Sequence, residues 1–520
     1  MNYKMWMFVG LVVWLASTSG LTAWAQGSEG ERCANLVGSR FDKLPDAPTH
    51  IVTAKVLTPA DGLPEVCDVR GYVASQVQFF VRMPTQNWNG KLLLSGCGGF
   101  CGSVYVASDR INDALKRGYA VTDSDMGHTS TALDGKWAYN NRQAEIDFAY
   151  RATHVNAVAA KAIVAAFYGR PQRYSYFYGC STGGRQGLME AQRFPEDFDG
   201  IIAGAPSTYY ATSNFQLLWS ALVNLDADNK PILKAPQVQL LHKAVREACD
   251  ALDGLKDGII EDPRNCKFDP GVLRCKGGDS DCLTDKQVEV VRKIYQGPVN
   301  SKGEKIHVGT AMLGSELNWI GPYSGGPIGP YIGDENTPGR YLTWMIDKLR
   351  YMTFFEDPGP SWELKDLDWD TDPARAGGLG SLYSATNPDL RKFKASGGKM
   401  IGYHGWQDQS VTPMQYVDYY ELTTSTMGGL AATQDFFRLF MLPGVNHCAT
   451  GPGADTIDYV SYLEEWVEKG KAPDVMIGKH IEGGVVKFTR PHFPYPGVAR
   501  YSGRGDVNDA ANWRRVTPGK

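Results

Sequence analysis

A serine flanked by glycines is the first feature of this sequence that could do chemistry. Residues 179–183, Gly-Cys-Ser-Thr-Gly, match the pattern G-x-S-x-G, with Ser181 at its centre. In this pattern the glycines permit a tight strand-to-helix turn that exposes the serine hydroxyl. The pattern alone is weak in a chain with 58 glycines among 520 residues, and an ordinary glycine-rich turn is the alternative. An apolar segment at 174–178 and a helix-compatible segment at 185–193 favour a nucleophilic serine.

A serine hydroxyl needs a base to remove its proton and a carboxylate to orient that base. Where such turns occur in hydrolases, the partners follow in the order Ser, Asp, His, each after a strand. Asp408 follows the apolar segment 399–404, and His447 follows the apolar segment 436–442. Both residues stand where this order requires them. For His404, at the end of its segment, we expect a packed structural role.

Two cysteines adjoin the predicted nucleophile and base. Cys180 precedes Ser181, and Cys448 follows His447. If Ser181 and His447 meet, their neighbours can reach the Cα separation of roughly 4.4–6.8 Å that a disulfide requires. We therefore predict a Cys180–Cys448 bond, with two unrelated cysteines as the alternative.

A glycine-rich loop at 96–102, Gly-Cys-Gly-Gly-Phe-Cys-Gly, follows the apolar segment 91–95. Backbone N–H groups near Gly98, together with that of Thr182, could stabilise the oxyanion of an acyl-transfer reaction. An ordinary turn is the alternative. Cys97 and Cys101 bracket the loop and could pair to stiffen it.

A segment rich in aspartate suggests a second kind of site. Carboxylates and carbonyls suit Ca²⁺, which takes roughly 6–8 oxygen ligands. The candidate ligands are the side chains of Asp250, Asp253 and Asp257 and the carbonyls of Leu255 and Ile259. The spacing is not that of an EF-hand, and a solvated acidic turn is the alternative. Cys249 and Cys266 bracket the segment.

The elements that must position these residues alternate between strands and helices. Short apolar segments predict strands at 91–95, 119–123, 174–178, 200–204, 399–404 and 436–442, and helical spacing predicts a helix over 141–168. This alternation indicates a mainly parallel sheet covered on both faces. With the serine motif it predicts an α/β-hydrolase core at 26–206 and 386–520. Residues 207–385, rich in Gly, Pro, Asp and aromatics, are predicted to form an inserted lid domain.

The first 25 residues have the pattern of a secretory signal peptide. Lys4 precedes an apolar stretch at 5–16, and Ala-Trp-Ala at 23–25 is a typical cleavage site. A membrane anchor is the alternative, but polar residues at 17–20 interrupt the stretch before the roughly 20 residues that a spanning helix needs. We expect a mature protein that begins near Gln26 and is secreted or periplasmic.

Composition limits the partners. The net charge is −4, and no long run of like charge occurs, so we expect neither nucleic acid nor a membrane as partner. Ten cysteines in an exported chain allow up to five disulfides.

The chain resembles the tannase/feruloyl esterase family. The resemblance is carried by residues 179–187 (Gly-Cys-Ser-Thr-Gly-Gly-Arg-Gln-Gly), 404–408 (His-Gly-Trp-Gln-Asp) and 446–448 (Asn-His-Cys). It implies an α/β-hydrolase with a large lid, a calcium ion bound in that lid by the loop described above, and cleavage of phenolic esters. It also implies the pairs Cys33–Cys67, Cys180–Cys448, Cys249–Cys266 and Cys275–Cys282. Relatives often carry another disulfide near the C-terminus, whereas this chain has no cysteine after Cys448 and has Cys97 and Cys101 instead.

We therefore expect an exported serine carboxylic ester hydrolase that cleaves small aromatic esters, such as feruloyl or chlorogenate esters, through an acyl-enzyme. Alternative substrates are mono(2-hydroxyethyl) terephthalate and gallate esters of tannins. A serine peptidase and a non-catalytic binding protein on an esterase scaffold are alternatives of other kinds. Lid aromatics could stack on the aromatic acid; the candidates are Trp219, Trp319, Tyr323, Tyr331, Trp344, Phe354 and Phe355.

Overall fold

The computed structural model describes residues 28–517 except 59–61, 278–280, 322–327 and 335–336, so the predicted signal peptide lies outside the described residues. Its centre is a nine-stranded sheet with strand order β1-β2-β3-β5-β4-β6-β7-β8-β9. The strands are β1 Thr49–Leu57, β2 Val66–Val73, β3 Val77–Pro84, β4 Lys91–Ser95, β5 Ala120–Ser124, β6 Tyr174–Cys180, β7 Gly200–Gly204, β8 Lys399–Gly405 and β9 Phe437–Leu442.

The six strands from β5 to β9 in this order are parallel to their neighbours, and β1, β2 and β3 add an antiparallel edge that joins at β5. All six predicted parallel strands are present within a residue or two of their expected bounds. The antiparallel edge was not predicted. Because the carboxyl ends of parallel strands meet at one edge of a sheet, residues that follow β6, β8 and β9 are brought together there.

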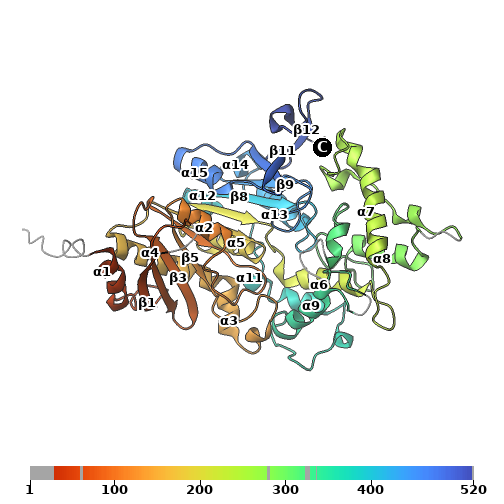
Figure 1. The fold of residues 1–520 in the computed structure, drawn as a ribbon. Helices are drawn as coiled ribbons and strands as arrows, with labels where there is room; N and C mark the ends of the chain where they lie inside the picture. Colours follow the sequence, from red (N-terminus) through yellow and green to blue (C-terminus); the bar gives the residue numbers. More distant parts are fainter. Residues whose placement is uncertain (1–27, 59–61, 278–280, 322–327, 335–336, 518–520) are drawn as a thin grey trace, which may run out of the picture.

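Helices cover both faces of the sheet (Figure 1). The buried leucines of β4 point alternately to the two faces. Leu93 packs with helices α2 (Asp109–Lys116) and α15 (Tyr459–Lys469) on one face. Leu92 and Leu94 pack on the other face, where the helices are α4 (Ala152–Tyr168), α5 (Thr182–Arg193) and α13 (Met414–Thr426). Burial on both faces is the reason that these strands are continuously apolar.

The helix predicted over 141–168 is divided. It consists of α3 (Arg142–Ile146), a π-helical turn at Asp147–Arg151, and α4. It ends at Gly169, whose φ of 68° is left-handed and favours glycine.

Between β7 and β8 the chain leaves the sheet and builds a second core. The helices of this stretch are α6 (Tyr210–Leu222), α7 (Ala235–Cys249), α8 (Asp285–Gln296), α9 (Arg340–Tyr351), α10 (Asp372–Gly377), α11 (Gly380–Tyr383) and α12 (Arg391–Ala395). Of these, α11 and α12 pack against the core of the sheet, through Tyr383 and Phe393. Buried side chains from Phe215 to Ala376 pack together in this part, which we call the lid. Figure 1 shows α6, α7, α8 and α9 gathered at one end of the molecule, away from α1 and β1.

The ends of the described chain are tied to the core. Helix α1 (Glu29–Ala34) is joined to β2 by the Cys33–Cys67 disulfide. Helix α14 (Leu430–Gln434) precedes β9. Two antiparallel strand pairs follow β9: β10 (Met476–Glu482) pairs with β11 (Val485–His492), and β12 (Val498–Tyr501) pairs with β13 (Trp513–Val516).

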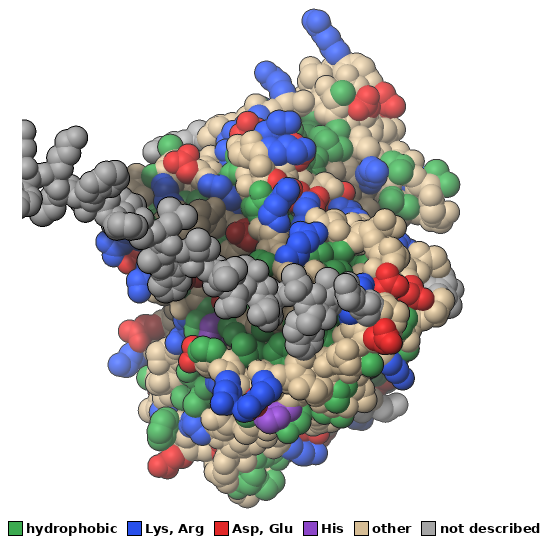
Figure 2. Space-filling view, turned by 90° about the vertical axis from the view of Figure 1, so that its left-hand side faces the viewer, with side chains coloured by type: hydrophobic (Ala, Val, Ile, Leu, Met, Phe, Trp, Pro, Cys, Tyr) green, Lys and Arg blue, Asp and Glu red, His purple; other side chains and the backbone are tan. Residues whose placement is uncertain are grey.

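The molecular surface carries both signs of charge. On the face in Figure 2, Lys and Arg side chains are interspersed with Asp and Glu. Within the described ranges, no helix combines the length and apolar character that a membrane-crossing segment needs.

Candidate active site

Ser181 occupies the turn between β6 and α5. Its backbone has φ 65° and ψ −123°, a strained conformation for a residue with a side chain. The flanking glycines are required by contact, since a Cβ on Gly179 would lie 2.4 Å from the carbonyl oxygen of Gly183. Strand and helix thus approach too closely for a side chain at Gly179, whereas a Cβ on Gly183 would lie 3.0 Å from the carbonyl oxygen of Cys97 in the neighbouring loop.

His447 and Asp408 follow β9 and β8 and meet at the same edge of the sheet. His447 Nδ1 lies 2.7 Å from Asp408 Oδ2. Asp408 is fully buried, and its Oδ1 accepts hydrogen bonds from the backbone N–H of Ser410 and Val411, both at 2.8 Å. Burial alone would raise the pKa of Asp408, but the charge of His447 and hydrogen bonds from His404 and His447 hold that pKa well below its usual value. The carboxylate thus stays ionised and fixes the ring of His447.

Ser181 and His447 line one cavity. Between these two described residues the structure forms no hydrogen bond, and such catalytic contacts commonly tighten only when substrate binds. The disulfide predicted beside them is present: Cys180 and Cys448 are bonded, with a Cα–Cα distance of 5.9 Å. It joins the nucleophile turn to the loop that carries the base.

His404 was expected to be structural, and its surroundings agree. Its side chain is completely buried, with Nε2 2.8 Å from the carbonyl oxygen of Val411 and 3.0 Å from Asp408 Oδ2. It does not line the cavity. His404 therefore supports Asp408 from behind, a contact that its spacing of four residues from Asp408 could have indicated.

The loop that contains Gly98 lies against the start of α5. Thr182 Oγ1 donates a hydrogen bond to the carbonyl of Gly99 at 2.6 Å, and Gly98 and Thr182 both line the cavity. The backbone N–H groups of Gly98 and Thr182 form no hydrogen bond with any described residue. Two unused donors beside Ser181 are what an oxyanion hole requires.

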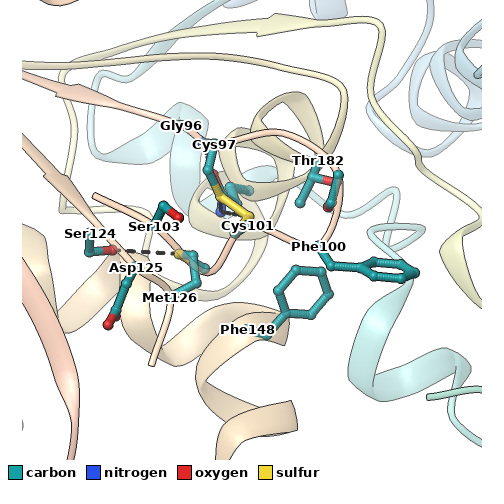
Figure 3. Close-up of a disulfide and its surroundings, with 12 residues drawn as sticks. Gly96, Cys97, Phe100, Cys101, Ser103, Ser124, Asp125, Met126, Phe148 and Thr182 are labelled. Carbon is teal, nitrogen blue, oxygen red and sulfur yellow. Dashed lines mark hydrogen bonds between the residues drawn. A yellow bond between two sulfur atoms is a disulfide. The ribbon is translucent and has the colours of Figure 1, made fainter. Parts of the chain in front are cut away.

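A disulfide between Cys97 and Cys101 closes this loop, with a Cα–Cα distance of 5.6 Å. Figure 3 shows the bond across the loop, with Thr182 beside the loop and Phe100 and Phe148 on the same side of the bond. Gln186 holds the loop from α5, since its side chain accepts from Cys97 N at 3.3 Å and donates to Cys97 Sγ at 3.0 Å. Gly99 has φ 58°, and a Cβ there would meet the carbonyl oxygen of Ala132 at 2.4 Å. The loop is thus constrained at both ends and at its centre.

The cavity has a volume of about 390 Å³. One wall comes from the catalytic edge of the sheet, and the other from α6 and α9 of the lid; the lid residues are Tyr210, Ser213, Leu217, Arg340, Tyr341, Trp344, Met345 and Lys348. Arg110, Arg340 and Lys348 are the charged residues among those that line it, and none of the described lining residues is Asp or Glu. An acyl group that enters this cavity meets aromatic surface and positive charge.

Of the lid aromatics considered from the sequence, Trp344 alone lines the cavity among the described residues. Trp219, Trp319, Tyr331 and Phe354 pack within the lid core or at its edge, and Phe355 is 73% exposed. Tyr323 lies outside the described residues. The sequence did not single out Tyr210, Tyr341 or Phe100, because their place at the cavity depends on how lid and core meet.

The aspartate-rich loop lies apart from the catalytic cavity, with no lining residue in common with it. Asp250 Oδ1 accepts from the backbone N–H of Gly258 at 3.0 Å, and Asp257 Oδ2 pairs with Arg490 at 2.9 Å. Burial, followed by the charges of Asp257 and Asp250, raises the pKa of Asp253. The Cys249–Cys266 disulfide closes the segment, as expected, and Cys275–Cys282 forms the remaining pair in the lid.

A different cluster lies between α4 and α5. In the described part of the chain, one trio of potential metal ligands has all its ligand atoms within 4.8 Å: His154, Glu190 and Asp197. Lys161 donates to the carbonyl of Asp197 and lies 3.9 Å from its carboxylate. The positive charge of Lys161 balances this cluster, so we assign it a structural role in helix packing.

Loss of the Cys180–Cys448 bond should lower activity by more than the accompanying loss of stability explains. Replacing both cysteines with serine frees the loop of His447 from the turn of Ser181, and a misplacement of about 1 Å can lower the rate on the order of 100-fold. The control is the double replacement of Cys275 and Cys282, which should lower the melting temperature and leave kcat little changed. Free thiols at Cys180 and Cys448 in non-reducing peptide maps would refute the premise.

The Cys97–Cys101 bond should act on the transition state. We expect C97S/C101S to lower kcat on the order of tenfold with little change in KM, because an oxyanion hole binds the tetrahedral intermediate more strongly than the substrate. Steady-state kinetics on an aryl ester measures this effect, with circular dichroism to establish that the variant is folded. A folded variant with unchanged kcat would show that the bond does not position the loop.

Comparison with known proteins agrees with this geometry. The chain is 34% identical to mono(2-hydroxyethyl) terephthalate hydrolase of Piscinibacter sakaiensis, covering 89% of this chain and 87% of that protein. It is also 34% identical to a probable feruloyl esterase of Arthroderma benhamiae, and this match covers 81% of this chain and 79% of that protein. The crystal structure of feruloyl esterase B from Aspergillus oryzae superposes with a TM-score of 0.82 at 28% identity, over 94% of this chain and 100% of that one. The family model for tannase and feruloyl esterase matches residues 62–516, and the chain therefore belongs to the tannase and feruloyl esterase family.

Proposed function

We propose that this protein is an exported serine esterase that hydrolyses esters of small aromatic acids. One observation carries the proposal: Ser181, His447 and the free N–H groups of Gly98 and Thr182 open on a single cavity whose opposite wall is the aromatic surface of the lid. The names of the relatives, which are feruloyl esterases and a terephthalate monoester hydrolase, support the same class of substrate.

The reaction follows from the geometry as two acyl transfers. Ser181 Oγ attacks the ester carbonyl while His447 takes its proton, and Asp408, bonded to Nδ1, stabilises the imidazolium. The carbonyl oxygen becomes an oxyanion that the N–H groups of Gly98 and Thr182 can bind. His447 returns the proton to the leaving alcohol, and the acyl-enzyme remains. Water then repeats the sequence and releases the acid.

The cavity favours an aromatic acyl group of modest size. A volume of about 390 Å³ lies in the range of small-molecule sites, and Trp344, Tyr341 and Phe100 offer faces or edges to a planar ring. The positive lining also supports mono(2-hydroxyethyl) terephthalate as a second candidate, since its acyl ring carries a free carboxylate. A peptidase is a weaker alternative, because the triad does not distinguish an amide from an ester but the cavity suits a small acyl group.

A substrate panel tests the proposal. We expect hydrolysis of at least one of methyl ferulate, chlorogenate, methyl gallate and mono(2-hydroxyethyl) terephthalate, and no cleavage of casein. Ser181→Ala, as the matched control, should lose 10³-fold or more of kcat/KM while its fold is retained, as is general for such triads. S181A activity within tenfold of wild type, or cleavage of casein but of no ester, would refute the assignment.

We also propose that the aspartate-rich loop holds a structural Ca²⁺. The donors are hard oxygens of the type that calcium prefers, and the carbonyls of Leu255 and Ile259 accept no hydrogen bond from a described residue. Burial, and then the charges of Asp257 and Asp250, raise the pKa of Asp253, and a bound cation would offset both effects by favouring the ionised carboxylate. When bound, the ion would supply charge neutralisation for Asp250, Asp253 and Asp257 rather than chemistry at the ester.

Calcium removal should therefore destabilise the lid without acting on the chemical step. A ligand that binds only the folded state raises stability, so we expect EDTA to lower the melting temperature and added Ca²⁺ to restore it. Activity measured at low temperature immediately after chelation should persist. Immediate loss of activity at an unchanged melting temperature would instead indicate a catalytic metal.

Export is part of the proposal. Five disulfides in one chain are typical of proteins that fold in an oxidising compartment. The signal-peptide pattern at residues 1–25 supports the same route, to the periplasm or beyond.

A further inference from the structure

We propose that Lys348 forms a polar subsite on the lid wall of the cavity, where it binds a phenolic hydroxyl on the aromatic ring of the acyl group. This inference rests on the proposed esterase function and narrows its substrate class to hydroxylated aromatic acids. Lys348 would be a specificity-determining residue, with no part in the bond-making steps.

The environment of Lys348 is unusual for a lysine. Its side chain lies on α9, is only 3% exposed, and lines the cavity that contains Ser181. Nζ donates to the carbonyl oxygen of Tyr210 at 2.6 Å and to Ser213 Oγ at 3.2 Å. An ammonium group has three N–H donors, so one donor remains without an acceptor among the described residues.

Lys348 also lacks a carboxylate partner within the described residues. A buried ammonium is costly unless it is paired, and the usual solution is an adjacent Asp or Glu. Here the ring of Tyr210 takes part of that role, because Nζ lies 3.7 Å from its centroid. Arg185 Cζ lies 4.8 Å from the same ring. One aromatic ring therefore interacts with two cations.

The two cations differ in what they face. Arg185 is fully buried behind the cavity and donates to the carbonyls of Phe148, Ala149 and Tyr383. Lys348 faces the cavity, and none of the described residues that line this cavity carries a carboxylate. Burial, and then the charge of Arg185, holds the pKa of Lys348 well below its usual value. In its ammonium form Lys348 can donate its third N–H to a phenol oxygen, and in its neutral form its lone pair can accept a hydrogen bond from the phenol O–H.

The competing interpretation is purely structural: Lys348 would serve only to bond the carbonyl of Tyr210 and hold α9 against α6. The two interpretations differ in how a substitution affects different substrates. A structural lysine affects all esters by the same factor, whereas a subsite affects only those that carry the hydroxyl.

The experiment measures kcat/KM of the full-length mature enzyme on methyl cinnamate and on its 3-hydroxy and 4-hydroxy derivatives. Each value is divided by the rate of alkaline hydrolysis of the same ester, which removes differences in intrinsic reactivity. We expect wild type to prefer at least one hydroxylated ester on the order of tenfold or more, because a buried donor is left unpaired by the unsubstituted ring. In Lys348→Met the preference should fall below about threefold, mainly through KM of the hydroxylated ester.

Two further variants keep the test decisive. Met345→Ala enlarges the same cavity without touching the cation, so it should change all three esters by a common factor. Lys348→Gln retains a donor for the carbonyl of Tyr210 and is used if the methionine variant does not fold. It should also reduce the preference for hydroxylated esters.

Two outcomes overturn the subsite but leave the esterase function intact: wild type that hydrolyses the three esters equally, or a folded Lys348 variant that keeps the full preference. Hydrolysis of none of these esters nor of any in the panel overturns the esterase function itself.

Discussion

The close contact between the end of β6 and the first turn of α5 is the constraint on which the site depends. With Gly183 so near Gly179, the backbone of Ser181 has no alternative path. The parallel arrangement of β6, β7, β8 and β9 then fixes where Asp408 and His447 emerge. The sheet therefore sets where these residues leave the strands, and the disulfides Cys180–Cys448 and Cys97–Cys101 constrain the loops that follow.

The lid forms the wall of the cavity that faces the sheet edge. Its helices α6 and α9 present aromatic and cationic side chains to the cavity of a protein whose net charge is negative. Lys348 bonds a carbonyl and contacts an aromatic ring instead of a carboxylate, and Arg185 behind the cavity does the same. Core and lid thus form different walls of the cavity: the sheet edge carries Ser181 and His447, and the lid carries aromatic and cationic side chains.

Much of this site could be predicted from the sequence because its signals are local. The strands that precede Ser181, Asp408 and His447 are short apolar segments, and order along the chain assigned the triad. The antiparallel edge escaped prediction because its alternation is broken. In β2, Asp68 is buried and pairs with Arg82 at 2.7 Å and Arg70 at 2.9 Å, so a charged residue occupies a core position.

The lid wall of the cavity could not be predicted for a related reason. Trp344 and Phe355 are both aromatic and lie close together in the chain, yet the first lines the cavity and the second is exposed to solvent. Composition and periodicity do not distinguish them, since the difference depends on the packing of α9 against α6 and the core. Nothing in the sequence indicated that Lys348 lines the cavity, because a lysine in a helix is ordinarily exposed to solvent.

The span of the Cys180–Cys448 bond has a consequence for where the enzyme can be active. The two cysteines are 268 residues apart, and the covalent loop that they close contains β7, the whole lid, β8 and β9. Because Cys448 follows all of these elements in the chain, the bond can form only after the whole loop has been synthesised. A chain held in a reducing cytoplasm would keep its nucleophile and its base on unlinked segments. Oxidation in a compartment that permits disulfides would then link the two segments covalently.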